Sequence, residues 1–213
     1  MQKSLVALGW DGGVKTPQCP SSFGTTDCLI HTVYQVENNI GLNPIEEFIH
    51  ETITHTVGFL PGMIRHSHQI RFSNTATKDE WPQGNYRTLV KLIVEDTAVL
   101  DSVTIDGKKV EDSRVTVSKE FGKVVIALPV EVGRSAPVIV SINYSSTATL
   151  EKGSAYLLFV QKQIGKPETP LTVSFDYESS FVPKTIAPAG ESFTDQTVFH
   201  SSLSENRIFG VGF

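Results

Sequence analysis

The chain has 213 residues, of which 39% are hydrophobic and 19% charged, and its formal net charge is -5. A chain of this size and composition can bury its own core, and it offers no basic surface for nucleic acid, so we exclude a nucleic-acid partner. No apolar run approaches the roughly 20 residues that a membrane helix needs, so we expect no membrane span within the chain.

Residues 1–44 are predicted to form an N-terminal segment with a disulfide loop. Residues 3–10 have the pattern of a helix end stopped by a glycine-rich turn, and 29–36 are predicted to form a strand. The only two cysteines, Cys19 and Cys28, bracket a loop rich in Pro, Ser, Gly and Thr. This pattern favours a disulfide in an oxidising compartment. Two unrelated buried thiols are the alternative, and a zinc site would need two more ligands.

The stretch 51–74 is predicted to form a hairpin about Pro61 and Gly62, which suit a type II turn. Residues 45–51 are ambiguous between a short helix and the start of the first hairpin strand. Side chains in a strand alternate between two faces, so a two-residue loop determines the register. The predicted opposed pairs are Phe59 with Ile64, Val57 with His66, His55 with His68, and Ile53 with Ile70.

Three histidines of this hairpin, His55, His66 and His68, share a face with its apolar residues. Opposed side chains of a hairpin have Cβ atoms about 5 Å apart, so the three rings are predicted to lie within reach of one another. Neutral imidazoles bind zinc or copper, and a catalytic zinc with three histidine ligands is the sharpest interpretation. The alternatives are imidazoles hydrogen-bonded to neighbouring hydroxyls and carbonyls, or a face that responds to pH.

Beyond a polar segment at 74–85, which is a candidate domain seam, short apolar runs alternate with turn residues. Asp106-Gly107 is the strongest hairpin signal, and 155–160 is apolar on both faces, which predicts a strand in the middle of a covered sheet. The sequence therefore predicts an all-β fold, an antiparallel β-sandwich of about ten strands over 45–213. The predicted strands after the seam are 86–94, 102–110, 114–119, 123–128, 136–144, 155–160, 171–177, 194–201 and 207–213.

Two pairs of acidic residues, Asp176 with Glu178 and Glu95 with Asp96, are candidates for acid–base chemistry or, alternatively, solvated strand ends. The sequence has neither a Gly-x-Ser-x-Gly elbow nor a Gly-x-x-x-x-Gly-Lys phosphate loop, so acyl transfer and nucleotide hydrolysis have no support. Four aromatic residues near predicted loops could form a glycan or protein contact surface, or pack the loops onto the sandwich. They are Trp10, Trp81, Tyr86 and Phe181.

Several motifs in order resemble the C-terminal region of an uncharacterised bacterial family, domain-of-unknown-function family 4012. They are GWDGGV (9–14), DCL (27–29), VENNIGLN (36–43), FSN (72–74), WPQGNYR (81–87) and YLLFVQKQIGKP (156–167). The family pattern often has a lysine where this chain has Pro44, so a role of such a lysine does not carry over. The resemblance implies an extracytoplasmic location at the cell surface, within a longer membrane-anchored protein, and it implies no catalytic residues.

These observations favour a non-catalytic, extracytoplasmic structural or binding module of a bacterial cell-envelope protein, with no cofactor. Its partners would be other cell-envelope proteins or glycans. One alternative is a metal-dependent enzyme or metal-binding site built on the three-histidine hairpin. The other is a glycan-binding module.

Overall fold

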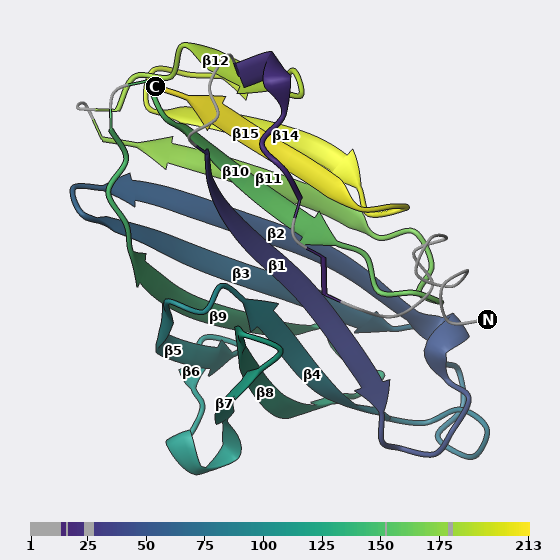
Figure 1. The fold of residues 1–213 in the computed structure, drawn as a ribbon. Helices are drawn as coiled ribbons and strands as arrows, with labels where there is room; N and C mark the ends of the chain where they lie inside the picture. The colour runs from purple at the N-terminus through teal and green to yellow at the C-terminus, as the bar shows by residue number, and fades with distance from the viewer. Residues whose placement is uncertain (1–13, 16, 24–27, 152, 179–180) are drawn as a thin grey trace, which may run out of the picture.

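The structure is a computed structural model that describes residues 14–15, 17–23, 28–151, 153–178 and 181–213. Two β-sheets are stacked face to face (Figure 1). In spatial order, sheet A contains β12 (Thr185–Ala187), β15 (Arg207–Gly212), β10 (Ala155–Gln161), β1 (Cys28–Asn39), β4 (Tyr86–Val94), β8 (Lys123–Val132) and β7 (Thr116–Glu120). Sheet B contains β13 (Glu191–Ser192), β14 (Gln196–Ser202), β11 (Pro170–Tyr177), β2 (Ile49–Leu60), β3 (Met63–Asn74), β9 (Val138–Thr147), β5 (Ala98–Ile105) and β6 (Lys108–Lys109).

The prediction of an all-β fold is confirmed, but the prediction of a purely antiparallel sandwich of about ten strands is wrong. The described residues form fifteen strands, and each sheet is mixed, because β1 pairs in parallel with β10 and β2 with β11. Parallel neighbours need a long connection, which is usually helical. Here strands of both sheets supply the connection, so the absence of predicted helices did not exclude parallel pairs.

The hairpin β2–β3 has the predicted register, with His55 opposite His68 and Val57 opposite His66. Gly62 has a φ of 74°, which a type II turn requires at its second central position. The ambiguous residues 45–51 divide between a short 3-10 helix, Glu46–Phe48, and the start of β2. Two further 3-10 helices are Ser21–Phe23 and Asp112–Arg114.

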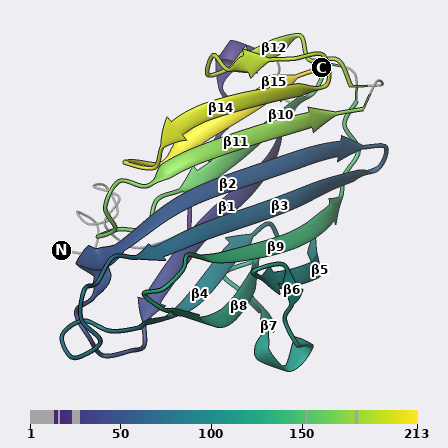
Figure 2. The same cartoon turned by 180° about the vertical axis from the view of Figure 1, so that it is seen from behind.

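The core lies between the two sheets and is built from the inward-facing residues of the longer strands. Figure 1 shows β1 crossing in front of the β2–β3 hairpin, and Figure 2 shows it behind, so these strands face each other from opposite sheets. All seven residues of β10 are buried between β15 and β1, as predicted for a covered central strand. This arrangement brings side chains of β1 directly against those of the hairpin.

Of the described residues before β1, Val14 lies on the outer face of sheet A. Val14 packs there against a small cluster that contains Tyr34, Ile93 and Val125. The predicted disulfide between Cys19 and Cys28 is confirmed, with Cα atoms 5.7 Å apart. It ties the residues before β1 to the first residue of that strand.

Two features bear on the predicted domain organisation. Strand β1 comes from the predicted N-terminal segment, 1–44, yet it lies in the middle of sheet A. The candidate seam at 74–85 is the connection from β3 in sheet B to β4 in sheet A.

The helix end predicted at 3–10 and the side chain of Trp10 lie outside the described residues. No helix in the described part of the chain is long and apolar enough to cross a membrane.

Candidate metal centre

Four of the six histidines are buried in the core, which is unusual for a side chain with two polar nitrogens. Three are the predicted hairpin residues, His55 on β2 and His66 and His68 on β3. The fourth, His31 on β1, reaches them from the opposite sheet. Strand alternation explains the inward direction of each ring, because each has the same phase as its apolar neighbours.

The four rings form a hydrogen-bonded chain rather than a cluster about one point. Nδ1 of His31 lies 2.9 Å from Nε2 of His66, and Nδ1 of His66 lies 3.1 Å from Nε2 of His55. Nδ1 of His55 lies 3.1 Å from Nδ1 of His68. Nε2 of His68 then lies 3.0 Å from Oε1 of Gln35. The three predicted histidines are therefore neighbours, but each ring nitrogen points at the next ring and not at a common point.

One carboxyl group faces the His31 end of this chain. Oε1 of Glu95, in the turn after β4, lies 3.5 Å from Nδ1 of His31 and 3.8 Å from Nε2 of His66. All three residues are at least 96% buried, with exposed fractions of 2% for each histidine and 4% for Glu95. Glu95 was a candidate for acid–base chemistry or a solvated strand end, and it lies in the core, whereas Asp96 beside it is exposed.

Burial determines the charge of these groups, because it disfavours their charged forms. It lowers the pKa of His31 and that of His68 to about 3, and it lowers the pKa of His55 and of His66 well below the usual range, with neighbouring imidazoles adding to the effect. All four rings are therefore neutral at pH 7, and the contacts of Glu95 with histidine are not ion pairs. Burial also raises the pKa of Glu95 to about 7.

Glu95 lacks the hydrogen bonds that a buried carboxyl group normally has. Within the described residues, neither of its oxygens has a hydrogen-bond partner of ordinary geometry, although the nearby Ser146 hydroxyl group opposes the rise in the pKa of Glu95. The hydroxyl oxygens of Ser146, Tyr144 and Tyr156 likewise lack such a partner. The Tyr144 ring stacks on His66 with centroids 4.5 Å apart, and the Tyr156 ring packs edge-on against His31. An unpartnered buried polar group costs on the order of 1 to 3 kcal/mol, so this concentration of them requires an explanation.

The arrangement has the chemistry and dimensions of a metal site. His31, His66 and Glu95 offer one ligand atom each, all within 4.8 Å of one another. Bonds of about 2.0 to 2.2 Å in a tetrahedral zinc site separate the ligand atoms by about 3.3 to 3.5 Å. The three observed separations, 2.9, 3.5 and 3.8 Å, bracket that value. The residues therefore fit a divalent transition metal, although the convergent set differs from the predicted three histidines.

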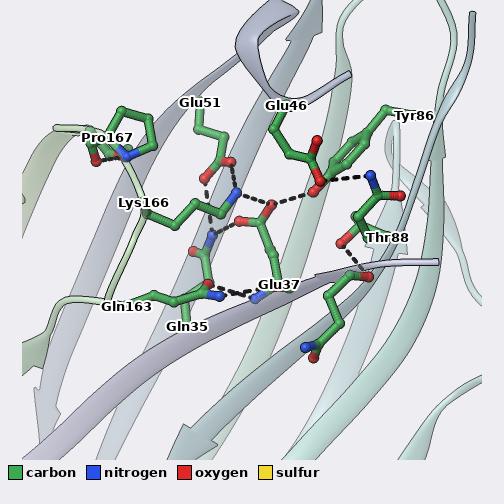
Figure 3. A network of polar contacts seen from close by, with 12 residues as sticks. Gln35, Glu37, Glu46, Glu51, Tyr86, Thr88, Gln163, Lys166 and Pro167 are labelled. Carbon is green, nitrogen blue, oxygen red and sulfur yellow. Dashed lines mark hydrogen bonds and ion pairs between the residues drawn. The ribbon is translucent and has the colours of Figure 1, made fainter. Parts of the chain in front are cut away.

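A second polar cluster lies at the other end of the histidine chain (Figure 3). The amide nitrogen of Gln35 lies 2.5 Å from Oε1 of Glu37 and 3.4 Å from Oε2 of Glu51. Lys166 points between the two carboxyl groups, 2.9 Å from Glu37 and 2.6 Å from Glu51. Tyr86 donates a hydrogen bond from its hydroxyl to Glu37. The adjoining cavity has a volume of only about 20 Å³, enough for about one water molecule and too small for a substrate.

The two acidic groups of this cluster share one lysine, which changes how Glu51 titrates. Burial and the nearby Glu37 carboxylate raise the pKa of Glu51 to about 8, against the opposing effect of Lys166. Between its ordinary pKa and pH 8 the folded protein therefore keeps a proton that the unfolded chain has released. The contribution of Glu51 to the free energy of unfolding is complete below the ordinary pKa and is lost as the pH rises towards 8.

Replacing Glu51 with Gln removes this titration while keeping a polar side chain of the same size. We expect the free energy of unfolding of Glu51→Gln to fall less between pH 5 and pH 8 than that of the unchanged protein. Urea denaturation at both pH values measures it. Glu47→Gln, at an exposed position, is the matched control. Equal slopes in Glu51→Gln and the control would contradict the expectation.

The other predicted site residues do not converge. Asp176 accepts hydrogen bonds from the side chains of Ser174 and Gln196, while Glu178 is exposed. Among the aromatic residues, Tyr86 is buried and Trp81 is 76% exposed, and Phe181 packs against the core. An open hollow of about 480 Å³ on the outer face of sheet B is bordered by His66, whose ring points inward, and by polar residues. These are Thr56, Arg65, Ser67, Asp101, Asn143 and Ser145.

Comparison with known proteins gives no family. No family model matches the sequence, and no curated protein matches it. A solved structure from Legionella pneumophila, provisionally assigned as a nutrient-binding protein, has a TM-score of 0.49 at 11% identity, over 85% of this chain and 71% of that one. Leukotriene A4 hydrolase from Saccharomyces cerevisiae has a TM-score of 0.40 at 13% identity, over 78% of this chain and 29% of that one. An M1 zinc metallopeptidase from Deinococcus radiodurans has a TM-score of 0.38 at 12% identity, over 76% of this chain and 41% of that one.

The chain thus spans less than half of each of these two enzymes. At such low identity and TM-score the likenesses carry no argument about function.

Proposed function

We propose that this protein is a non-catalytic, extracytoplasmic binding module of a bacterial cell-envelope protein, and that its ligand is a transition-metal ion held by His31, His66 and Glu95. The observation that carries the proposal is the buried carboxyl group of Glu95, which has no hydrogen-bond partner of ordinary geometry among the described residues and lies beside two neutral imidazole nitrogens. A cation at this point would supply the partner that both oxygens lack. Imidazole and carboxylate ligands suit zinc, and imidazole also suits copper and nickel.

The burial of the three ligands supports a structural rather than a catalytic ion. Catalytic zinc keeps an open position for water or substrate, whereas structural sites are closed. With exposed fractions of 4% or less, none of the three groups presents its ligand atom to solvent. The fourth ligand would come from within the core, where the hydroxyl groups of Tyr144 and Tyr156 also lack hydrogen-bond partners among the described residues. The competing enzyme hypothesis would need an opening that these burial values do not favour.

The extracytoplasmic part of the proposal rests on the disulfide and on the family resemblance. A disulfide between Cys19 and Cys28 is typical of oxidising compartments. Protease treatment of intact cells that express the full-length gene product tests the location. Degradation of this domain in intact cells is expected, and complete protection until lysis would contradict it.

Cobalt titration tests the metal site directly, because Co²⁺ occupies zinc sites and gives visible absorption bands when bound. The protein is purified without a histidine tag, stripped with a chelator and titrated. We expect saturation at one equivalent and loss of the bands in His66→Ala and in the more conservative His66→Gln. The double variant His50→Ala/His200→Ala, which removes the two exposed histidines, is expected to bind normally. Binding that survives His66→Gln but is lost in the exposed-site variant would overturn the proposal, as would the absence of binding to cobalt, zinc or copper.

A further inference from the structure

The side-chain amide of Gln35 can face the histidine chain in only one way. Its nitrogen is 2.5 Å from a Glu37 oxygen, and its oxygen is 3.0 Å from Nε2 of His68. A flipped amide would place its oxygen against the carboxylate of Glu37, which Lys166 holds at 2.9 Å. Carboxylates accept hydrogen bonds and do not donate them when ionised, so the amide nitrogen must face Glu37. His68 must therefore donate from Nε2 to Gln35.

This single orientation determines the position of the proton on each following ring, because a neutral imidazole has one N–H group and one lone pair. With its proton on Nε2, His68 accepts at Nδ1 from Nδ1 of His55. His55 then accepts at Nε2 from Nδ1 of His66. His66 is left with a lone pair on Nε2, which in the metal-free protein accepts from Nδ1–H of His31. His31 therefore has to lose its Nδ1 proton before that nitrogen can bind a metal ion. Nε2 of His66 is the nitrogen that faces His31 and Glu95.

We infer that Gln35 is a positioning residue for the metal centre: through His68 and His55 it holds His66 in the tautomer whose Nε2 lone pair is available to a metal ion. The opposite order would put a proton on Nε2 of His66 and block the ligand position. Hydrogen bonds from the second nitrogen of a ligating histidine are a general means of fixing its tautomer. An amide oxygen accepts a hydrogen bond but does not pass a proton on. The hydrogen-bonded histidines therefore orient His66 and do not form a path for protons.

The effect of this tautomer order on metal binding rests on the proposed function. The order itself is a property of the metal-free protein and can be measured there. Long-range ¹H–¹⁵N NMR measures it, since protonated and unprotonated ring nitrogens have well-separated ¹⁵N shifts. In the chelator-treated protein at pH 7 we expect protonated Nδ1 in His66 and His55 and protonated Nε2 in His68. A proton on Nε2 of His66 would overturn the inference, even if every variant failed to fold.

Variants of Gln35 separate positioning from packing. Gln35→Met keeps the volume but removes the acceptor, so we expect mixed tautomers for His68, His55 and His66 and a Kd for Co²⁺ that is about 10- to 100-fold weaker. Gln69→Met, the same substitution on the exposed face of β3, is the matched control. In the exchanged pair Gln35→Glu/Glu37→Gln, the carboxylate at position 35 accepts from Nε2–H of His68, and the amide at position 37 donates to that carboxylate. This double variant is therefore expected to have the tautomers and the Kd of the unchanged protein.

Unchanged tautomers and an unchanged Kd in Gln35→Met would overturn the positioning role. If the tautomer order is as stated but no metal binds, the proposed function fails while the orienting chain stands. If metal binds and the wild-type tautomers are reversed, the inference fails while the proposed function stands. The two claims are therefore tested separately by one set of samples.

Discussion

Removal of the proposed metal ion is expected to lower the Tm of this protein by about 5 to 11 °C. An ion that binds only the folded state, present at about a hundred times its Kd, stabilises that state by about 2.7 kcal/mol. For a chain of 150 to 250 residues, each kcal/mol shifts the Tm by about 2 to 4 °C. Differential scanning calorimetry of the chelator-treated protein, with and without added zinc, measures the shift. The ligands come from β1, β3 and the turn after β4, so the ion would join the two sheets.

Two histidine variants of this protein serve as controls for the calorimetry. His66→Gln is expected to have the same Tm with and without zinc, whereas His50→Ala/His200→Ala is expected to keep the full shift. Zinc that raised the Tm of both variants equally would be acting at some other site, and the expectation would be wrong. A shift lost only in the exposed-site variant would assign the effect to surface histidines.

The hairpin shows how far the sequence could predict the site. Alternation and the Pro61-Gly62 turn were sufficient to place His55 opposite His68, because a strand pair joined by a two-residue loop has one register. A run that is apolar on both faces also identified β10 as a covered strand. These predictions depend only on residues that are close in the sequence.

The candidate metal centre could not be predicted in the same way, because its proposed ligands come from three separate parts of the fold. His31 has the same phase as Val33 and Gln35 in a predicted strand, which indicates a shared face but not what lies opposite. Its contact with His66 depends on the stacking of sheet A on sheet B, and the parallel pairing of β1 with β10 that positions it was not predicted. Glu95 follows a strand end, where carboxyl groups are usually solvated, so its burial has no local signal.

Replacing His55, one of the two inner rings of the histidine chain, should destabilise the metal-free protein by about 2 to 6 kcal/mol. His55→Leu leaves Nδ1–H of His66 and the Nδ1 lone pair of His68 without partners, and each unpartnered buried group costs about 1 to 3 kcal/mol. Leucine has nearly the volume of histidine, so the cost of a cavity is small. Urea denaturation with chelator present measures the loss. Ile53→Leu, at the preceding inward position of β2, is the matched control and should cost less than about 1.5 kcal/mol.

A double-mutant cycle distinguishes this hydrogen-bonded chain from four independently buried histidines. His68→Leu alone leaves Nδ1–H of His55 and the oxygen of Gln35 without partners, whereas the double variant leaves only Nδ1–H of His66 and the oxygen of Gln35. The double variant therefore has two unpartnered groups, as each single variant does, and should cost about as much as one of them. Additive losses would mean that the rings contribute separately. A sub-additive loss would mean that the four histidines act as one hydrogen-bonded unit, in which each buried ring depends on the partner beside it. Such dependence is expected if the hydrogen-bonded histidines are there to orient His66.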